Sequence, residues 1–357
     1  MTYQKIINFG PGDPDFTTPL HIKEAAIKAI EEDFSHYCFG PGLPELREAA
    51  ARYFRMRTGV EVGTGEIFFS MGSSMAIYAA LLNILKPGDE GVFIEPSFPP
   101  VAGMMQLCNS KVVRVPLKAE NSFHLDINDL RRSVTEKTKV IYICNPNNPT
   151  GTVHTREELS GLAEVANDID AFVVSDEVYN RFVWDDHTWT PLIALDGMRE
   201  RGIHVFSCSK SFAMTGWRLG FFVATEKFVS ETAQKMQPFI IPSFIQKAGV
   251  AAYSGPFDDT EIMEKEYYKR LKFASSRLDK LKGWNCPMPE GTLYLWANVR
   301  ESGLTDAEVA EALKEKAKVI VGARGNGYLR ISMTRPTEEV EEGIKRIEEV
   351  WESIIKK

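Results

Sequence analysis

Residues 205–220 read VFSCSKSFAMTGWRLG and hold the most unusually placed lysine of the chain. Val205 and Phe206 are apolar and suit the end of a buried strand. Lys210 then follows among serines, whereas most lysines of soluble proteins lie on surface helices with their amines in water. A lysine that reacts with a carbonyl group needs a partly shielded position, where its amine can lose its proton. The stretch therefore predicts a Schiff-base lysine at a strand end.

Short apolar runs alternate with helix-length segments on both sides of this stretch. The apolar runs occupy residues 68–70, 91–95, 111–116, 139–145, 171–176 and 203–207. Strands that are apolar throughout and separated by helices are typical of a parallel sheet covered on both faces. The sequence thus predicts an α/β fold, with its functional residues at the carboxyl ends of the strands.

A charged helical stretch, residues 258–282, follows the last of these units and is too long to be a simple crossover. Beyond it, the expected strands at 292–299, 319–323 and 328–332 mix with two further helices. This order indicates a smaller α+β domain, with the long helix as its connection.

The composition of the chain excludes several classes of partner and of binding site. The chain has 357 residues and a formal charge of −7, which disfavours nucleic acid and acidic membranes as partners. The start has no apolar core of signal-peptide length, and charges interrupt every later apolar run, so we expect a cytoplasmic protein. The five cysteines include no C-x-x-C pair, which argues against a disulfide framework or a zinc site. We therefore predict no metal.

Polar clusters follow the first two predicted strands. Gly72, Ser73 and Ser74 open a helix, and such an opening offers free N–H groups to a phosphate. An ordinary helix cap explains the cluster equally well. Phe98 follows residues 91–95 and could stack on a flat heterocycle, although a core position is the simpler interpretation when it is considered alone.

Two more clusters follow later strands. Residues 145–151 read NPNNPTG, a rigid turn that contains Asn148. Residues 175–179 read SDEVY, which places Asp176 at the end of a buried strand and Tyr179 just beyond it. A buried carboxylate needs a cation or a protonated partner, although a helix cap remains the alternative.

Together these motifs resemble those of the class I and II aminotransferases, the aspartate aminotransferase-like enzymes of fold type I that use pyridoxal 5'-phosphate (PLP). The resemblance begins at the GDPDFTTP segment, residues 12–19, and extends to YLRIS around Arg330. It implies a large domain at residues 38–270, with a mainly parallel, seven-stranded sheet between helices. Residues 1–37 and 271–357 would form the small domain.

The resemblance also implies residue roles. Lys210, Asp176 and Tyr179 would be catalytic: Lys210 would bind PLP covalently and move a proton, and Asp176 would pair with the pyridinium nitrogen. The substrate would contact Arg330, Gly12 and Asn148, with Arg330 gripping its α-carboxylate. The full set of cofactor-binding residues would be Gly72, Ser73, Ser74, Phe98, Asn148, Asp176, Tyr179, Ser207, Ser209, Lys210, Arg218 and Tyr37.

Tyr37 matches a family tyrosine that reaches the phosphate of a neighbouring subunit, which implies a homodimer. The loop before Arg330 is short, and the motifs give no second arginine for a side-chain carboxylate. With Phe98 and the apolar residues at 99–105, this favours a neutral or aromatic amino acid.

The sequence therefore predicts a PLP-dependent aminotransferase that acts on an L-amino acid and a 2-oxo acid. Two alternatives stay open. One is a PLP-dependent lyase of the same fold that eliminates at Cβ, and the other is a non-catalytic PLP-binding domain.

Overall fold

The computed structural model describes residues 5–237 and 240–355. Residues 1–4 and 356–357 of the predicted small domain, and 238–239 of the predicted large domain, lie outside this range. Among the described helices, none is long and apolar enough to cross a bilayer.

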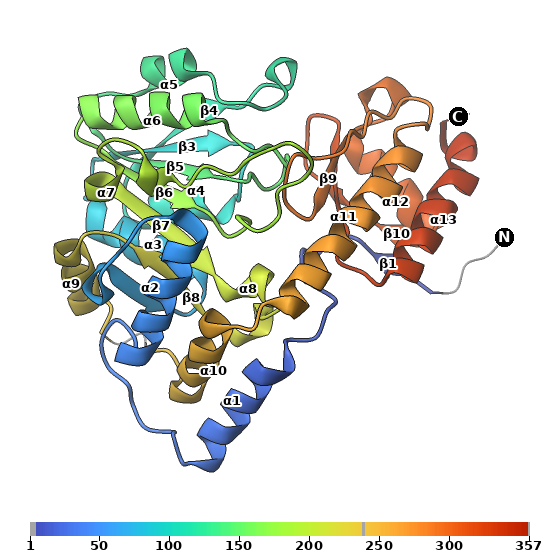
Figure 1. The fold of residues 1–357 in the computed structure, drawn as a ribbon. Coiled ribbons are helices and arrows are strands. Elements are labelled where there is room, and N and C mark those ends of the chain that lie inside the picture. The colour runs from blue at the N-terminus through green and yellow to red at the C-terminus, as the bar shows by residue number, and fades with distance from the viewer. Residues whose placement is uncertain (1–4, 238–239, 356–357) are drawn as a thin grey trace.

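A seven-stranded sheet forms the centre of the larger part of the described chain (Figure 1). Its strands, in spatial order, are β2 (Ile67–Ser70), β8 (Gly220–Val223), β7 (Gly202–Ser207), β6 (Phe172–Asp176), β5 (Thr138–Cys144), β3 (Glu90–Glu95) and β4 (Lys111–Pro116). β8 runs antiparallel to both of its neighbours, and all other neighbours pair in parallel. The predicted α/β fold with a mainly parallel sheet is confirmed.

The central strands are apolar on both faces because helices cover both. Along β5, Val140, Tyr142 and Cys144 belong to one core cluster, and Ile141 and Ile143 belong to another. Helices α3 (Ser73–Ile84) and α4 (Pro100–Leu107) contribute to the first cluster, whereas α5 (Ile127–Ser133) and α6 (Arg156–Asp168) contribute to the second. Burial of each large apolar side chain stabilises the fold by about 1.5–3 kcal/mol.

A third core cluster lies at the β2–β8 end of the sheet, under α2 (Pro44–Thr58) and α10 (Ser243–Ser254). α10 also packs against α1 (Leu20–Glu31). The short helix α8 (Cys208–Ser211) also contributes to this cluster, whereas α7 (Met198–Arg201) contributes to the cluster of α5 and α6, and α9 (Glu226–Lys235) to that of α3 and α4. The six apolar runs named from the sequence did not include β8, so the sequence analysis missed this strand. Its reversed direction leaves no signal either, because an apolar strand reads the same in both directions.

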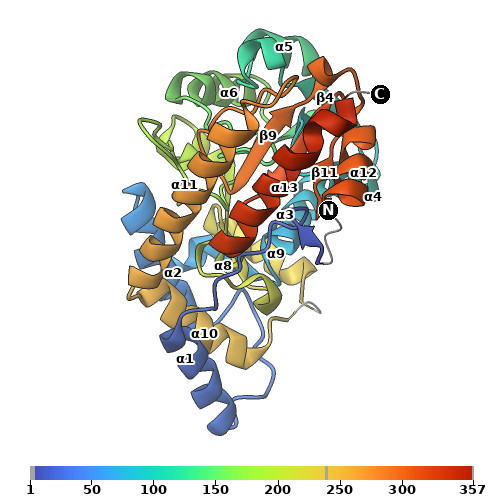
Figure 2. The same cartoon turned by 90° about the vertical axis from the view of Figure 1, so that its right-hand side faces the viewer.

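The C-terminal part contains a smaller antiparallel sheet, which α11 (Asp258–Leu278) approaches from the large sheet (Figures 1 and 2). This sheet has the order β11 (Gly322–Ala323), β12 (Tyr328–Ser332) and β9 (Tyr294–Asn298), and its neighbours include α12 (Asp306–Lys316) and α13 (Thr337–Ile355). Near the other end of the chain, β1 (Ile7–Asn8) pairs in parallel with β10 (Val319–Ile320). The predicted domain boundary after residue 270 falls inside α11, and the division into two domains stays a prediction.

The topology brings distant segments to one edge of the large sheet. β2, β3, β5, β6 and β7 all point the same way, so their carboxyl ends share this edge. Each of the predicted polar clusters follows one of these ends. The fold therefore predicts that they meet.

Candidate active site

A cavity of about 270 Å³ lies at this edge and brings most of the predicted site residues together. The predicted residues that line it are Gly12, Ser73, Ser74, Phe98, Asn148, Asp176, Tyr179, Ser209, Lys210, Arg218 and Arg330. Gly72, Ser207 and Tyr37 do not line it.

Lys210 lies at the strand end that the sequence predicted. The chain leaves β7 at Ser207 and turns at once into the short helix α8, whose first N–H groups need acceptors. Ser207 Oγ accepts a hydrogen bond from the N–H of Ser209 at 3.1 Å and so begins the helix. Lys210 points into the cavity and donates to the carbonyl oxygen of Gly12. Ser207 thus supports the lysine without lining the cavity.

Asp176 ends β6 with its carboxylate buried, at 5% exposure. Burial raises its pKa to about 6, although two hydrogen bonds act in the opposite direction. The hydroxyl of Tyr142 donates to Oδ2 at 3.0 Å, and the N–H of Val178 donates to Oδ1 at 3.4 Å. A buried acid in such a position is suited to a cationic group in the cavity.

Ser73, Ser74 and Arg218 form a site suited to a dianion. The two serines open α3, where backbone N–H groups and the helix dipole favour negative charge. Arg218 forms no ion pair with an acidic residue within the described chain, and its Nη1 donates to the carbonyl of Thr215 at 2.7 Å. Glycine is favoured at position 72 beside them, because its φ of 82° is one that L side chains rarely adopt, and a Cβ there would lie 2.4 Å from Arg218 Nη2.

Arg330 reaches the cavity from the smaller sheet. Its Nη1 donates to Asn148 Oδ1 at 3.0 Å, and its Nη2 donates to the carbonyl of Gly10 at 2.8 Å. Its guanidinium carbon lies 4.4 Å from the centre of the Tyr294 ring. No carboxylate of the described residues pairs with Arg330, so its charge remains available for an anionic ligand.

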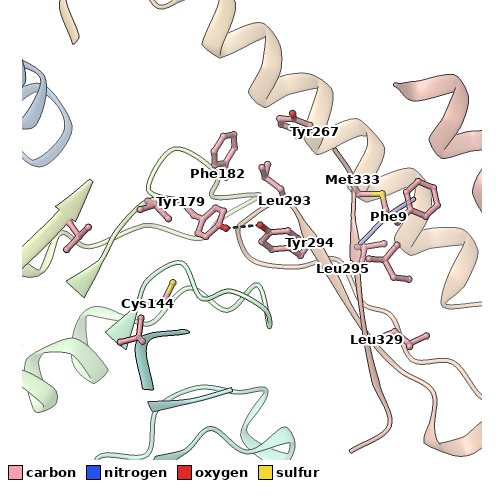
Figure 3. Packing of buried hydrophobic residues seen from close by; sticks show 14 of the residues in the cluster. Phe9, Cys144, Tyr179, Phe182, Tyr267, Leu293, Tyr294, Leu295, Leu329 and Met333 are labelled. Atoms are coloured by element: carbon pink, nitrogen blue, oxygen red, sulfur yellow. Dashed lines mark hydrogen bonds between the residues drawn. The ribbon is translucent and has the colours of Figure 1, made fainter. Parts of the chain in front are cut away.

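Tyr294 is a cavity residue that the sequence analysis missed. It comes from β9, and its hydroxyl lies 2.7 Å from that of Tyr179, so the bond joins the two sheets' parts of the cavity (Figure 3). A Cβ on Gly12 would lie 2.0 Å from the same hydroxyl, which explains the glycine. Strand alternation could have placed Tyr294 on one face of its strand, but which face meets Arg330 depends on a pairing that the sequence does not reveal.

Two other expectations differ from the structure. Tyr37 is 80% exposed, on the loop between α1 and α2, and does not reach the cavity of its own chain. From the apolar segment at 98–105, only Phe98 lines the cavity, because Val101 and Met105 face the core. This segment therefore adds less apolar surface to the site than expected.

The cavity can therefore hold a ligand with three features: a phosphate-like anion, a ring nitrogen that takes a proton, and a carbonyl carbon within reach of an amine. A further anion can bind at Arg330. PLP with an amino acid has all of these features, so the residues present fit that cofactor.

Comparisons with known proteins agree with this arrangement. The family model "Aminotransferase class I and II" matches residues 4–347. The chain is 39% identical to the aspartate aminotransferase of Pyrococcus abyssi, over 97% of this chain and 91% of that protein. It is 37% identical to aromatic-amino-acid aminotransferase 2 of Thermococcus litoralis, with the same coverage of both chains.

Solved structures give the same result. The aromatic aminotransferase from Pyrococcus horikoshii superposes with a TM-score of 0.93 at 36% identity, over 99% of this chain and 97% of that one. These matches favour amino-group transfer over the elimination and non-catalytic alternatives. The chain belongs to the class I and II aminotransferases, and it is a PLP-dependent enzyme that transfers an amino group between an amino acid and a 2-oxo acid.

Proposed function

We propose that the cavity around Lys210 is the active site and that its residues act as the family resemblance implies. The observation that carries this proposal is one cavity that contains a shielded lysine, a buried acid and two arginines without acidic partners in the described chain. PLP supplies an electron sink for the bond that breaks at the amino acid's Cα. The protein supplies binding, orientation and proton transfer.

Arg218, the opening of α3 and Ser209 would hold the cofactor's phosphate, because these groups offer a charged fork and several donors. Gly72 leaves room for the Arg218 side chain, and Ser207 accepts the hydrogen bond that holds Ser209 in place. Phe98 would pack against the ring of the cofactor. The carboxylate of Asp176 would pair with the ring nitrogen and keep it protonated, which would offset the cost of burying that carboxylate.

Asn148 and Tyr179 bind the ring oxygen. Asn148 uses Oδ1 to accept from Arg330, which leaves its amide N–H groups to donate to the cofactor. Tyr179 stays neutral and able to donate, because burial raises its pKa well above the usual value. The contact with Tyr294 fixes the position of the Tyr179 hydroxyl.

Lys210 and Arg330 act on the substrate. Arg330 binds the α-carboxylate with its planar fork and so orients the Cα–H bond. With PLP bound, the Lys210 amine would be the group that takes the proton from the substrate's Cα and carries it, as a general base and then a general acid. Gly12 closes this part of the cavity, and its carbonyl oxygen holds the amine until a substrate arrives.

The preferred donor in this proposal is a neutral or aromatic amino acid. Phe98 and Tyr294 give the cavity aromatic surface, and one relative is named for aromatic amino acids. An acidic donor is the second candidate, because other relatives are named aspartate aminotransferases. Arg324 would then bind its second carboxylate: it directly follows β11, which pairs with β12 so that Gly322 lies opposite Arg330.

The enzyme acts as a homodimer in a reducing compartment such as the cytoplasm. Tyr37 and Phe39 are 80% and 70% exposed with their rings 5.5 Å apart, which leaves an aromatic pair on the surface. Contact with a second subunit would bury this pair and bring Tyr37 to that subunit's phosphate site. All five cysteines are free, as expected where thiols stay reduced.

Asp176→Asn should affect stability and catalysis in opposite directions. The folded pKa of about 6 lies above the ordinary 3.8, so the carboxylate opposes folding above pH 6 and not below pH 4. In cofactor-free protein, the variant should raise the free energy of unfolding at pH 8 by ~3 kcal/mol, since each pKa unit corresponds to about 1.4 kcal/mol. With PLP bound, kcat should fall at least ~100-fold.

Denaturant unfolding at pH 4 and pH 8, together with steady-state kinetics, measures both effects. Asp196→Asn is the control, because Asp196 is exposed and does not line the cavity. It should change neither the free energy of unfolding nor kcat. Unchanged turnover in Asp176→Asn would refute the proposed pairing with the ring nitrogen.

A donor panel distinguishes the two substrate candidates. We expect kcat/KM to be higher for phenylalanine, tyrosine or leucine than for aspartate, and Arg324→Gln to change these values by less than about twofold. Arg300→Gln is the control, because Arg300 donates to the Tyr328 hydroxyl at 2.9 Å and lines a different cavity. If aspartate is preferred and Arg324→Gln lowers its kcat/KM by about 10-fold or more, the acidic candidate replaces the first.

Subunit mixing tests whether Tyr37 serves the neighbouring chain. Tyr37→Phe should weaken PLP binding about tenfold, because it removes one hydrogen bond to the phosphate. A heterodimer of one Tyr37→Phe chain and one Lys210→Ala chain should regain one site of native PLP affinity and activity. A monomer by light scattering, or a heterodimer no better than Tyr37→Phe alone, would contradict the shared site.

A further inference from the structure

Two histidines and two glutamates meet outside the active site, at the start of α6. Nδ1 of His124 lies 3.0 Å from Oε2 of Glu158, and its Nε2 lies 3.1 Å from Oε1 of Glu290. Nδ1 of His154 lies 3.9 Å from the same Glu158 oxygen, too far for a hydrogen bond. The cluster joins three segments: the loop before α5, the first turn of α6 and the chain just before β9.

His154 is the unexplained member of this group. Its side chain is fully buried, and neither ring nitrogen has a hydrogen-bond partner among the residues that the structure describes. A neutral imidazole ring offers a lone pair on one of its nitrogens, and here that lone pair has no hydrogen-bond donor to accept from among the described residues. A buried polar group without a partner destabilises the fold, and a bound ligand would compensate by satisfying the ring nitrogens.

The geometry fits a small cation that binds imidazole and carboxylate. One ligand atom each from His124, His154 and Glu158 can be chosen so that all three lie within 4.8 Å of one another. Zinc binds such atoms at about 2.0–2.1 Å in a tetrahedron, which places ligand atoms roughly 3.4 Å apart. The separations of 3.0 and 3.9 Å lie on either side of this value.

The surroundings of the group also resemble those of metal-binding histidines. If His124 binds through Nδ1, its Nε2–H donates to Glu290, and a carboxylate in this place fixes the ring's tautomer and orientation. Glu290 is itself held, because its Oε2 accepts from the N–H of Val153 at 2.7 Å. The His124 side chain is 22% exposed and that of Glu158 is 14% exposed, so water can reach a fourth position.

A simpler interpretation explains part of the cluster. Glu158 completes a capping box with Thr155 at the start of α6, and a proton on His124 can bridge the two carboxylates, which raise its pKa to about 10. This interpretation accounts for three of the four side chains. It does not explain why both ring nitrogens of the buried His154 lack a hydrogen-bond partner among the described residues.

We propose that His124, His154 and Glu158 bind one Zn²⁺ ion, with Glu290 orienting His124 and water as the fourth ligand. The proposal revises the expectation of no metal, which rested on the cysteines. The ion would bind beside the NPNNPTG turn, since His154 follows that turn closely and its backbone N–H donates to Asn145 Oδ1 at 2.9 Å. It would stiffen the turn that carries Asn148 without touching the substrate.

Zinc binding to the PLP-loaded, chelator-treated enzyme tests this proposal. Equilibrium dialysis with metal analysis should show one tight Zn²⁺ per chain, and Zn²⁺ should raise Tm. His154→Phe and Glu158→Gln should each weaken binding at least tenfold and abolish the rise in Tm. His154→Phe removes the unpaired ring nitrogens, and Glu158→Gln keeps a side chain able to complete the capping box.

Glu157→Gln is the matched control, since it alters the exposed neighbour of Glu158 and should bind like the native enzyme. Co²⁺ should give the visible absorption of a tetrahedral site in the native and control proteins only. The proposal would be overturned if the native enzyme bound no Zn²⁺ at a free Zn²⁺ concentration of roughly 100 µM, which corresponds to weak binding. Unchanged zinc affinity in His154→Phe would also overturn it.

Discussion

The buried carboxylate of Asp176 is the constraint on which the site depends. It ends a central strand, under the cover of Tyr142 and the backbone of Val178, and its two hydrogen bonds do not fully offset the cost of burial. The fold retains a destabilising charge at the middle of its sheet edge. In the proposed site a bound ring cation would remove that cost, which would link the stability of the cofactor-free protein and its affinity for the cofactor through this one residue.

The second requirement is that two sheets meet. The large sheet supplies Lys210, Asp176 and the phosphate-binding groups, whereas the smaller sheet supplies Arg330 and Tyr294. Two contacts join the two sets: Tyr179 with Tyr294, and Arg330 with Asn148. The groups proposed to bind the cofactor thus contact those proposed to bind the substrate, and a small displacement between the sheets would change both.

Much of this arrangement could be predicted from the sequence, because strand ends leave a local signal. Each of four site residues follows the end of an apolar run: Gly72, Asn148, Asp176 and Lys210. Because the strands are predicted to be parallel, all four are expected at the same edge of the sheet. Features that depend on strand pairing or on distant packing could not be predicted. Tyr294 needs the register of β9 against β12, and His154 becomes unusual only when its buried surroundings are known. The approach of Arg324 to Arg330 requires the turn between β11 and β12.

The most direct test of the central claim is a single half-reaction. PLP-loaded enzyme is mixed with its best amino donor and no 2-oxo acid, and the 2-oxo acid and ammonia that form are counted per site. The account predicts one equivalent of 2-oxo acid, no ammonia, and no product from Lys210→Ala, since the lysine amine must move the proton from Cα. Repeated turnover with release of ammonia, or native product from Lys210→Ala, would contradict it.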